Sequence, residues 1–165
     1  MILLSDANVI IDLAYVGGIW VLPRLADTEI LDLVLMECEH PSQPMLVDDV
    51  KAAGIRVIPV QADWINQAEP YRRNSPLSMQ DCLNVFYAKN YQRTLLAGDL
   101  PLREVCHKEG IDLRGSIWIV QQAFEQGLVP AKELLQWMKT WPEKGRRLPK
   151  ADLKRLADLL QTGAD

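Results

Sequence analysis

Four acidic residues occupy positions where a fold built on parallel strands would bring them together. Asp6, Glu37 and Asp99 each follow a short apolar run, and Asp81 lies in the first turn of a predicted helix. In an open parallel sheet all strands end at the same edge, and ligands bind outside that edge. We therefore expect these four side chains to converge on one small patch, although they are far apart along the chain.

Such convergence is costly without a counter-charge. Two carboxylates ~4 Å apart repel by roughly 4 kcal/mol at an effective dielectric constant of about 20. A divalent cation would remove this repulsion, and ligands that are all oxygen favour Mg²⁺ or Mn²⁺ over zinc. A cation held in this way can activate a water molecule and neutralise charge on a phosphate. The pattern therefore predicts the chemistry of phosphodiester hydrolysis, with no side-chain nucleophile.

Each acid also has a purely structural explanation. Asp6 and Asp99 precede predicted helices, where Asp is a favoured N-cap that stabilises by about 1 kcal/mol. Ser78 and Asp81 have the spacing of a capping box, and Glu37 could be one exposed charge at the end of a strand. The shared topological position of all four favours a common site over four unrelated caps.

Short apolar runs alternate with longer helical patterns, which is typical of βα units around a parallel sheet. The predicted strands are residues 2–4, 30–36, 55–60, 94–97 and 111–113. The predicted helices are residues 7–15, 49–53, 78–91, 102–108, 116–125 and 131–140, the last stopped by Pro142. We expect one domain over residues 1–142.

The C-terminal part of the chain differs from the rest in charge. Residues 139–155 carry seven Lys or Arg against two acids, a balance of +5, so the net charge of −4 leaves −9 for the remainder. Residues 143–165 are predicted to be a basic linker followed by a helical appendage over residues 153–160. This basic segment could contact phosphates or an acidic partner, or it could be a solvated helix surface.

Several stretches resemble the motifs of PIN domains. Residues 6–11 (DANVII) are similar to the opening D-x-[NS]-[VI] motif, and residues 77–83 (LSMQDCL) with Ala88 resemble the LSxxDxxxxxxA helix. Residues 95–100 (LLAGDL) resemble the LLTxD strand end, and Gly115-Ser116 resembles the Gly-Ser/Thr step of a late helix. The order and spacing agree over roughly residues 1–140.

The resemblance implies a three-layer α/β/α fold with a central, mostly parallel sheet. It also implies a Mg²⁺- or Mn²⁺-dependent endoribonuclease, as in VapC-type toxins, with RNA as substrate, a small antitoxin protein as inhibitor and a homodimer as assembly. By position, the metal-facing carboxylates would be Asp6, Asp81 and Asp99, and the further catalytic acid would be Glu37. The supporting residues that would orient water or a carboxylate are Asn8 and Ser78.

Two positions depart from the family pattern. Ala97 replaces the hydroxyl residue usual two places before the last Asp, which removes a hydrogen bond from the site. Glu39 stands two residues after Glu37 and, in a continuing strand, would lie on the same face. We favour Glu37 because the apolar run ends immediately before it, and Glu39 stays open as the alternative.

Other functions follow from other features. A catalytically silent PIN-like module that binds RNA or protein would tolerate Ala97, although the three retained aspartates argue against it. An aspartyl-phosphate hydrolase would need a second Asp where Asn8 stands. A zinc site from Cys38, His40, Cys106 and His107 lacks the spacing of any standard finger.

Cysteine usage and hydropathy favour the cytoplasm. Three cysteines form no paired framework, which indicates a reducing compartment. Asp6 and Asp12 interrupt the apolar N-terminus, so we expect neither a signal peptide nor a membrane span.

Aromatic and basic residues offer further RNA contacts. Trp141, beside the basic segment, is the indole that we would test for stacking on bases, whereas Trp118 and Trp137 are expected in the core. The cations that could border the acidic cleft are Arg72, Arg73, Lys89, Arg93 and Arg103.

Overall fold

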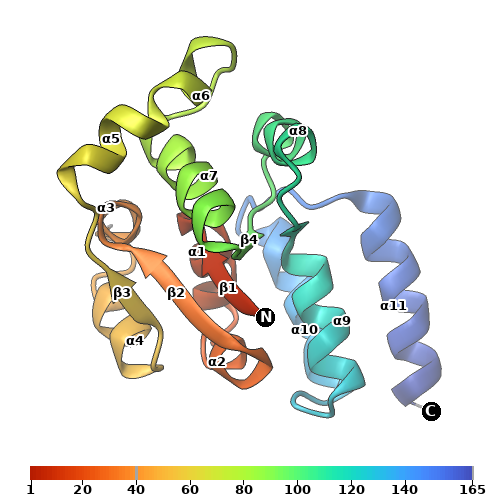
Figure 1. The fold of residues 1–165 in the computed structure, drawn as a ribbon. Coiled ribbons are helices and arrows are strands. Elements are labelled where there is room, and N and C mark those ends of the chain that lie inside the picture. Colours follow the sequence, from red (N-terminus) through yellow and green to blue (C-terminus); the bar gives the residue numbers. More distant parts are fainter. Residues whose placement is uncertain (40, 165) are drawn as a thin grey trace.

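A parallel sheet forms the centre of the computed structural model, which describes residues 1–39 and 41–164. Within these residues the sheet has five strands in the order β3-β2-β1-β4-β5, and every neighbouring pair is parallel. The strands are β1 (Ile2–Ser5), β2 (Asp27–Leu31), β3 (Arg56–Ile58), β4 (Thr94–Leu96) and β5 (Leu113–Arg114). The predicted α/β architecture is confirmed (Figure 1).

Helices cover both faces of the sheet. They are α1 (Ala7–Tyr15), α2 (Val21–Leu25), α3 (Asp32–Leu35), the 3₁₀ turn η1 (Met36–Cys38), α4 (Leu46–Ala52), α5 (Ala62–Ala68), α6 (Pro70–Arg73), α7 (Met79–Tyr91), α8 (Leu100–Glu109), α9 (Ser116–Glu125), α10 (Ala131–Glu143) and α11 (Lys150–Ala164). The chain crosses from β1 towards β3 in one direction and returns through β4 to β5 in the other. Because such crossovers are right-handed, α7 and α8 lie on one face, and α1 and α2 on the other, where α9 and α10 join them.

The central strand β1 and its neighbour β4 contain fully buried apolar residues. Leu3 and Leu4 of β1 and Leu95 and Leu96 of β4 are fully buried. Strands covered by helices on both faces need apolar side chains in both directions. This explains why the strand signals are continuous apolar runs without alternation.

The prediction of one strand over residues 30–36 is wrong. The strand β2 ends at Leu31, and the following residues form α3 and η1. The Oδ1 atom of Asp32 accepts hydrogen bonds from the backbone N–H of Leu33 at 2.7 Å and of Val60 at 3.1 Å. These bonds turn the chain out of the sheet, so Glu37 lies in a 3₁₀ turn and does not directly follow a strand.

The expected stop before Pro142 is also wrong, because α10 continues to Glu143. Trp141 is fully buried, and its Nε1–H donates to the backbone oxygen of Asp12 at 2.7 Å. This bond anchors the end of α10 to α1. It also contradicts the hypothesis that Trp141 stacks on RNA bases.

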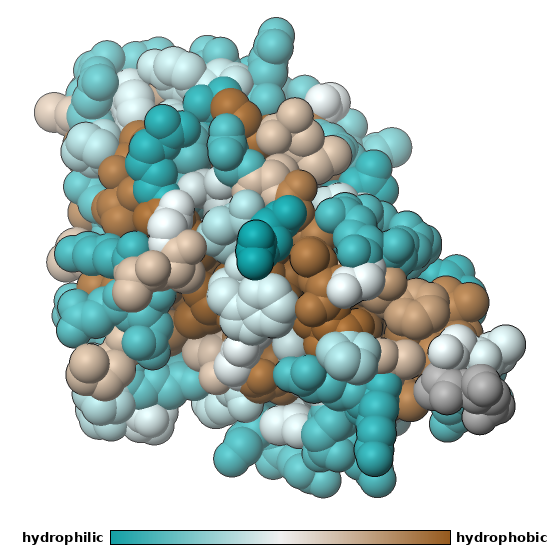
Figure 2. Space-filling model, turned by 90° about the horizontal axis from the view of Figure 1, so that it is seen from below, coloured by the Kyte–Doolittle hydropathy of each residue, from teal (hydrophilic) through white to brown (hydrophobic). Residues whose placement is uncertain are grey.

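The C-terminal helices pack closely against the rest of the fold. α11 lies against α10 and α9, and apolar residues continue along the underside of the molecule up to the end of α11 (Figure 2).

In the part of the chain that is described, no helix combines the length and hydrophobicity needed to cross a membrane.

Gly18 lies in close contact with Trp137. A Cβ atom at Gly18 would lie 2.6 Å from Cη2 of Trp137, so only glycine fits below this indole.

Replacing Gly18 by Ala tests this close approach. Trp137 is buried and cannot yield without disturbing its neighbours, so we expect Gly18→Ala to lower the free energy of unfolding by about 1–3 kcal/mol. Urea unfolding followed by tryptophan fluorescence measures the change. Gly98→Ala is the control, because its added methyl group meets no atom within 4 Å. Equal unfolding midpoints for the two variants would contradict the packing argument.

Candidate functional site

Asp6 lies between the end of the central strand β1 and the start of α1, beside the end of β4. Its backbone N–H donates to the oxygen of Leu96 at 2.9 Å, which joins the end of β1 to β4. Its Oδ1 atom accepts from the N–H of Val9 at 2.8 Å and caps α1. The residue is only 5% exposed, so this carboxyl group is fixed at the carboxyl edge of the sheet.

β1 and β4 also form the switch point of the sheet, since the crossovers on their two sides run in opposite directions. Open parallel sheets bind their ligands outside the carboxyl ends of the strands at such a point. Asp99 follows β4 by three residues and is the exposed N-cap residue of α8. Asp6 and Asp99 therefore flank the place where the topology predicts a ligand.

Asp81 is oriented by Ser78 at the start of α7. The Ser78 hydroxyl accepts from the Asp81 N–H at 3.1 Å, and Asp81 Oδ2 accepts from the Ser78 N–H at 3.3 Å. Oδ1 of Asp81 has no hydrogen bond to any described residue. The predicted supporting residue Ser78 thus holds the carboxylate of Asp81 and leaves one oxygen available.

The acids lie close enough to perturb one another. Burial raises the pKa of Asp6 to about 7, and the charges of Asp12, Asp81 and Glu37 add to this rise. Burial also raises the pKa of Asp81, against the hydrogen bonds from Ser78, and the charge of Asp99 adds to the rise. Partial burial and the charge of Asp81 raise the pKa of Glu37. The charges of the predicted acids therefore act on one another at this edge of the sheet, Asp99 through Asp81, with Glu37 contributed by η1.

Asp12 is an acid beside the site. It was not predicted as a site residue, and its only role in the prediction was to interrupt the apolar N-terminal stretch. It is 7% exposed; Oδ2 accepts from the Ser116 hydroxyl at 3.1 Å, and Oδ1 accepts from Nε of Arg146. Burial raises its pKa against these hydrogen bonds and the charge of Arg146. The signal in the sequence that could have identified Asp12 was an acid within the apolar stretch of α1, six residues after Asp6.

The other predicted supporting residue, Asn8, is exposed and contacts the same arginine. Its Oδ1 accepts from Nη2 of Arg146 at 3.2 Å. The role expected for Asn8, to orient water or a carboxylate, stays a prediction.

Two of the candidate cations belong to ion pairs elsewhere. Lys89 pairs with Glu109, and Nε of Arg93 lies 2.7 Å from Oε1 of Glu29. Glu29 is buried within β2 and also accepts from the Tyr87 hydroxyl at 3.0 Å. This buried network holds β2 to α7 and was not predicted from the sequence.

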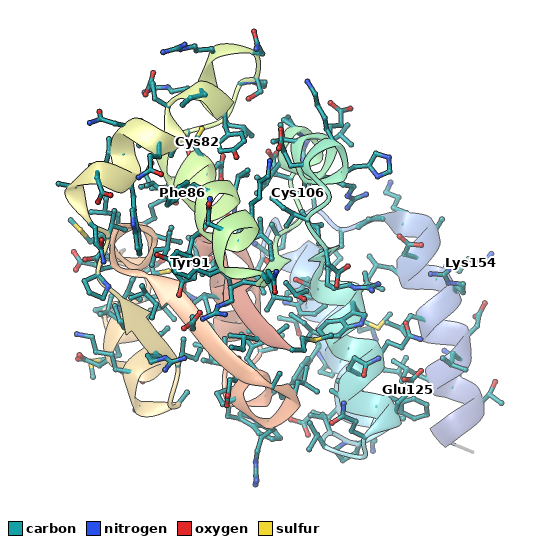
Figure 3. All side chains as sticks on the ribbon, viewed as in Figure 1. Cys82, Phe86, Tyr91, Cys106, Glu125 and Lys154 are labelled. Carbon is teal, nitrogen blue, oxygen red and sulfur yellow. The ribbon has the colours of Figure 1, made fainter. Side chains whose placement is uncertain are left out.

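The three cysteines are buried on three separate elements. Cys38, Cys82 and Cys106 are free and buried, the last two on α7 and α8 (Figure 3). Burial raises their thiol pKa values to about 12, 11 and 12, and charges of the site acids add to each rise. They remain neutral thiols at neutral pH. His40 lies outside the described residues.

The donor set fits a hard cation better than zinc. Among the described residues no three Asp, Glu, His or Cys side chains form a ready-made metal cage. Mg²⁺ commonly takes one or two carboxylates and keeps several waters, so it needs no such cage. Oδ1 of Asn84, 1% exposed and three residues after Asp81 on α7, has no hydrogen-bond partner in the described chain. This orphaned oxygen lies on the same side of the helix as Asp81 and is a further hard donor.

A protein-family comparison agrees with this geometry. The model of a PIN-domain family matches residues 2–162. The chain belongs to the PIN-domain family. PIN domains are generally nucleases, so this PIN domain is a nuclease-like module. The matched range includes α10 and most of α11. A search of curated proteins finds no similar sequence.

Asp6→Asn tests the electrostatic cost of the PIN-domain site. The pKa of Asp6 is about 7 in the folded protein and about 3.8 in the unfolded chain. Between these pH values the folded state binds more protons, so the stability of the wild type falls as the pH rises. We expect Asp6→Asn, which keeps an oxygen to cap α1, to be more stable than the wild type at pH 8 in EDTA, by up to about 4 kcal/mol. Urea unfolding at several pH values measures this gap.

The gap should shrink as the pH is lowered towards 4, where the wild-type carboxyl group is protonated in the folded state. Asp49→Asn, at an exposed position in the first turn of α4, controls for the loss of one negative charge. A difference between Asp6→Asn and wild type that stays constant from pH 4 to pH 8 would contradict the assignment.

Proposed function

We propose that this PIN domain is a Mg²⁺- or Mn²⁺-dependent endoribonuclease that hydrolyses RNA phosphodiester bonds. The observation that supports it is the electrostatic coupling of acids from separate segments of the chain at the switch point between β1 and β4. Acids that raise one another's pKa values in this way are stabilised by a cation. Isolated helix caps would show no such coupling.

The cation would be held by Asp6, Asp81 and Asp99. When bound, it would lower the pKa of a water molecule and neutralise charge on the scissile phosphate. Asp6 offers a carboxyl group that the hydrogen bonds to Leu96 and Val9 hold in place. The capping box with Ser78 holds Asp81 in the same way, so little reorganisation is needed when substrate binds.

Glu37 would accept the proton of the attacking water on its carboxylate. Its raised pKa makes it a stronger base than an ordinary glutamate. It lies on an exposed turn, so the proton can pass on to solvent. The charge of Glu37 raises the pKa of Asp6 and the charge of Asp81 raises the pKa of Glu37, which favours Glu37 over Glu39 for this role.

The family resemblance extends the proposal to partners. In this proposal the protein is the toxin of a toxin–antitoxin pair. Its inhibitor is an antitoxin protein that covers the acidic edge of the sheet, and the protein assembles as a homodimer. The three free, buried cysteines support a reducing compartment such as the cytoplasm.

Asp81→Asn tests the proposed activity. We expect the wild type to cleave a mixed RNA pool in Mn²⁺ and the variant to cleave about 10²–10³-fold more slowly, because one charged ligand is lost while an amide oxygen can still accept from the Ser78 N–H. Denaturing gels of the products measure the rates. Asp49→Asn is the control and should cleave like the wild type.

The second candidate function is a catalytically silent PIN module. The observation that favours it is Ala97, which offers no hydroxyl group two residues before Asp99. RNA binding by the wild type, without cleavage in either Mg²⁺ or Mn²⁺, would support this module and contradict the nuclease.

A further inference from the structure

A cavity of about 350 Å³ opens beside Asp99 at the carboxyl edge of the sheet. Its walls come from the start of α1, the turn from β4 into α8, the start of α9, and residues 146–149 with Asp152. The last of these segments belongs to the basic C-terminal part of the chain. We call residues 144–149, which join α10 to α11, the basic strap.

Arg146 fastens the basic strap to the domain. Its Nε donates to Oδ1 of Asp12, and its Nη2 donates to Oδ1 of Asn8 at 3.2 Å. The carboxylate of Asp12 compensates the charge of this guanidinium. Arg146 therefore holds the strap in place and is not the residue that offers uncompensated charge to a ligand.

The neighbouring arginines differ from Arg146. Arg103 on α8 and Arg147 on the strap both line the cavity, both are exposed, and neither forms an ion pair within the described residues. The lining acids Asp12 and Asp152 are paired with Arg146 and Arg155. Over the described chain this leaves Asp99 as the lining acid without an ion pair, in a cavity that is also lined by the two unpaired guanidinium groups of Arg103 and Arg147.

Guanidinium groups bind phosphate oxygens through paired, charge-assisted hydrogen bonds. The volume of the cavity is in the range of pockets that enclose one small ligand, which matches one unit of a single strand and not a base-paired helix. Asp99 connects this cavity to the acid cluster, so a phosphate held here would be adjacent to the one that is cleaved.

We propose that Arg103 and Arg147 bind a backbone phosphate of single-stranded RNA next to the scissile one, and that the basic strap thereby completes the substrate site. The identification of the ligand as RNA rests on the proposed nuclease function. The two arginines are positioning residues, and Arg146 positions the strap that carries one of them.

The experiment compares the full-length wild type with Arg103→Ala/Arg147→Ala. Binding of a fluorescein-labelled 12-nucleotide single-stranded RNA is followed by anisotropy in EDTA at several salt concentrations, so that the readout does not depend on cleavage. We expect the double variant to bind about 10-fold or more weakly. The slope of log K against log salt should fall by about 0.7, because the variant loses its contact with one phosphate of the single strand.

Lys132→Ala/Lys139→Ala is the matched control. It removes the same charge from exposed positions on α10 that line a different groove. We expect its affinity to stay within twofold of the wild type and its salt slope to be unchanged. Equal losses in the two double variants would mean that only net charge matters and would overturn the proposal, as would a wild type that does not bind the RNA at 50 mM salt.

Cleavage in Mn²⁺ separates this inference from the function on which it rests. RNA binding that depends on Arg103 and Arg147, without any cleavage, would support the phosphate site and contradict the nuclease. Full cleavage and unchanged binding by Arg103→Ala/Arg147→Ala would support the nuclease and contradict the phosphate site.

Discussion

The burial of the Asp6 carboxyl group is the constraint on which the rest of the site depends. A carboxylate removed from water is stable only with hydrogen bonds or a counter-charge. Within the described residues the N–H of Val9 donates to the Asp6 carboxyl group, while three acids nearby oppose its ionisation. The strands β1 and β4 and the helix α1 hold it there because its own backbone is part of their hydrogen bonding. The fold thus maintains a local excess of negative charge that a hard cation would relieve.

Capping and metal binding are not competing explanations for these aspartates. Asp6 caps α1 through Oδ1, Asp81 completes the capping box of α7 by accepting from the N–H of Ser78, and Asp99 occupies the N-cap position of α8. In a parallel α/β fold the helices begin at the edge where the strands end. Residues that suit helix starts are therefore already located at the ligand edge, and one oxygen can serve the helix while the other faces the site.

Local patterns allowed most of the fold and the acid cluster to be predicted. β1 and β4 were predicted from continuous apolar runs, and α7 was predicted from its capping box, because these patterns are local in the sequence. The end of β2 was missed because it is set by the hydrogen bond that the N–H of Val60 donates to the Asp32 carboxylate, 28 residues earlier in the chain. Asp12 and Trp141 were misjudged for the same reason, since the bond that joins them spans 129 residues and leaves no periodic signal.

The hydrogen bonds between α1 and the C-terminal segment make that segment part of the same folding unit as the sheet. Trp141 and Arg146 both bind Asp12, and Trp137 packs over Gly18. A chain truncated after α10 would leave Asp12 with the Ser116 hydroxyl and no cation, and a buried anion without its partner is strongly destabilising. The smallest autonomous form of this protein therefore extends beyond its last sheet-covering helix, and a shortened expression fragment would have to include the strap.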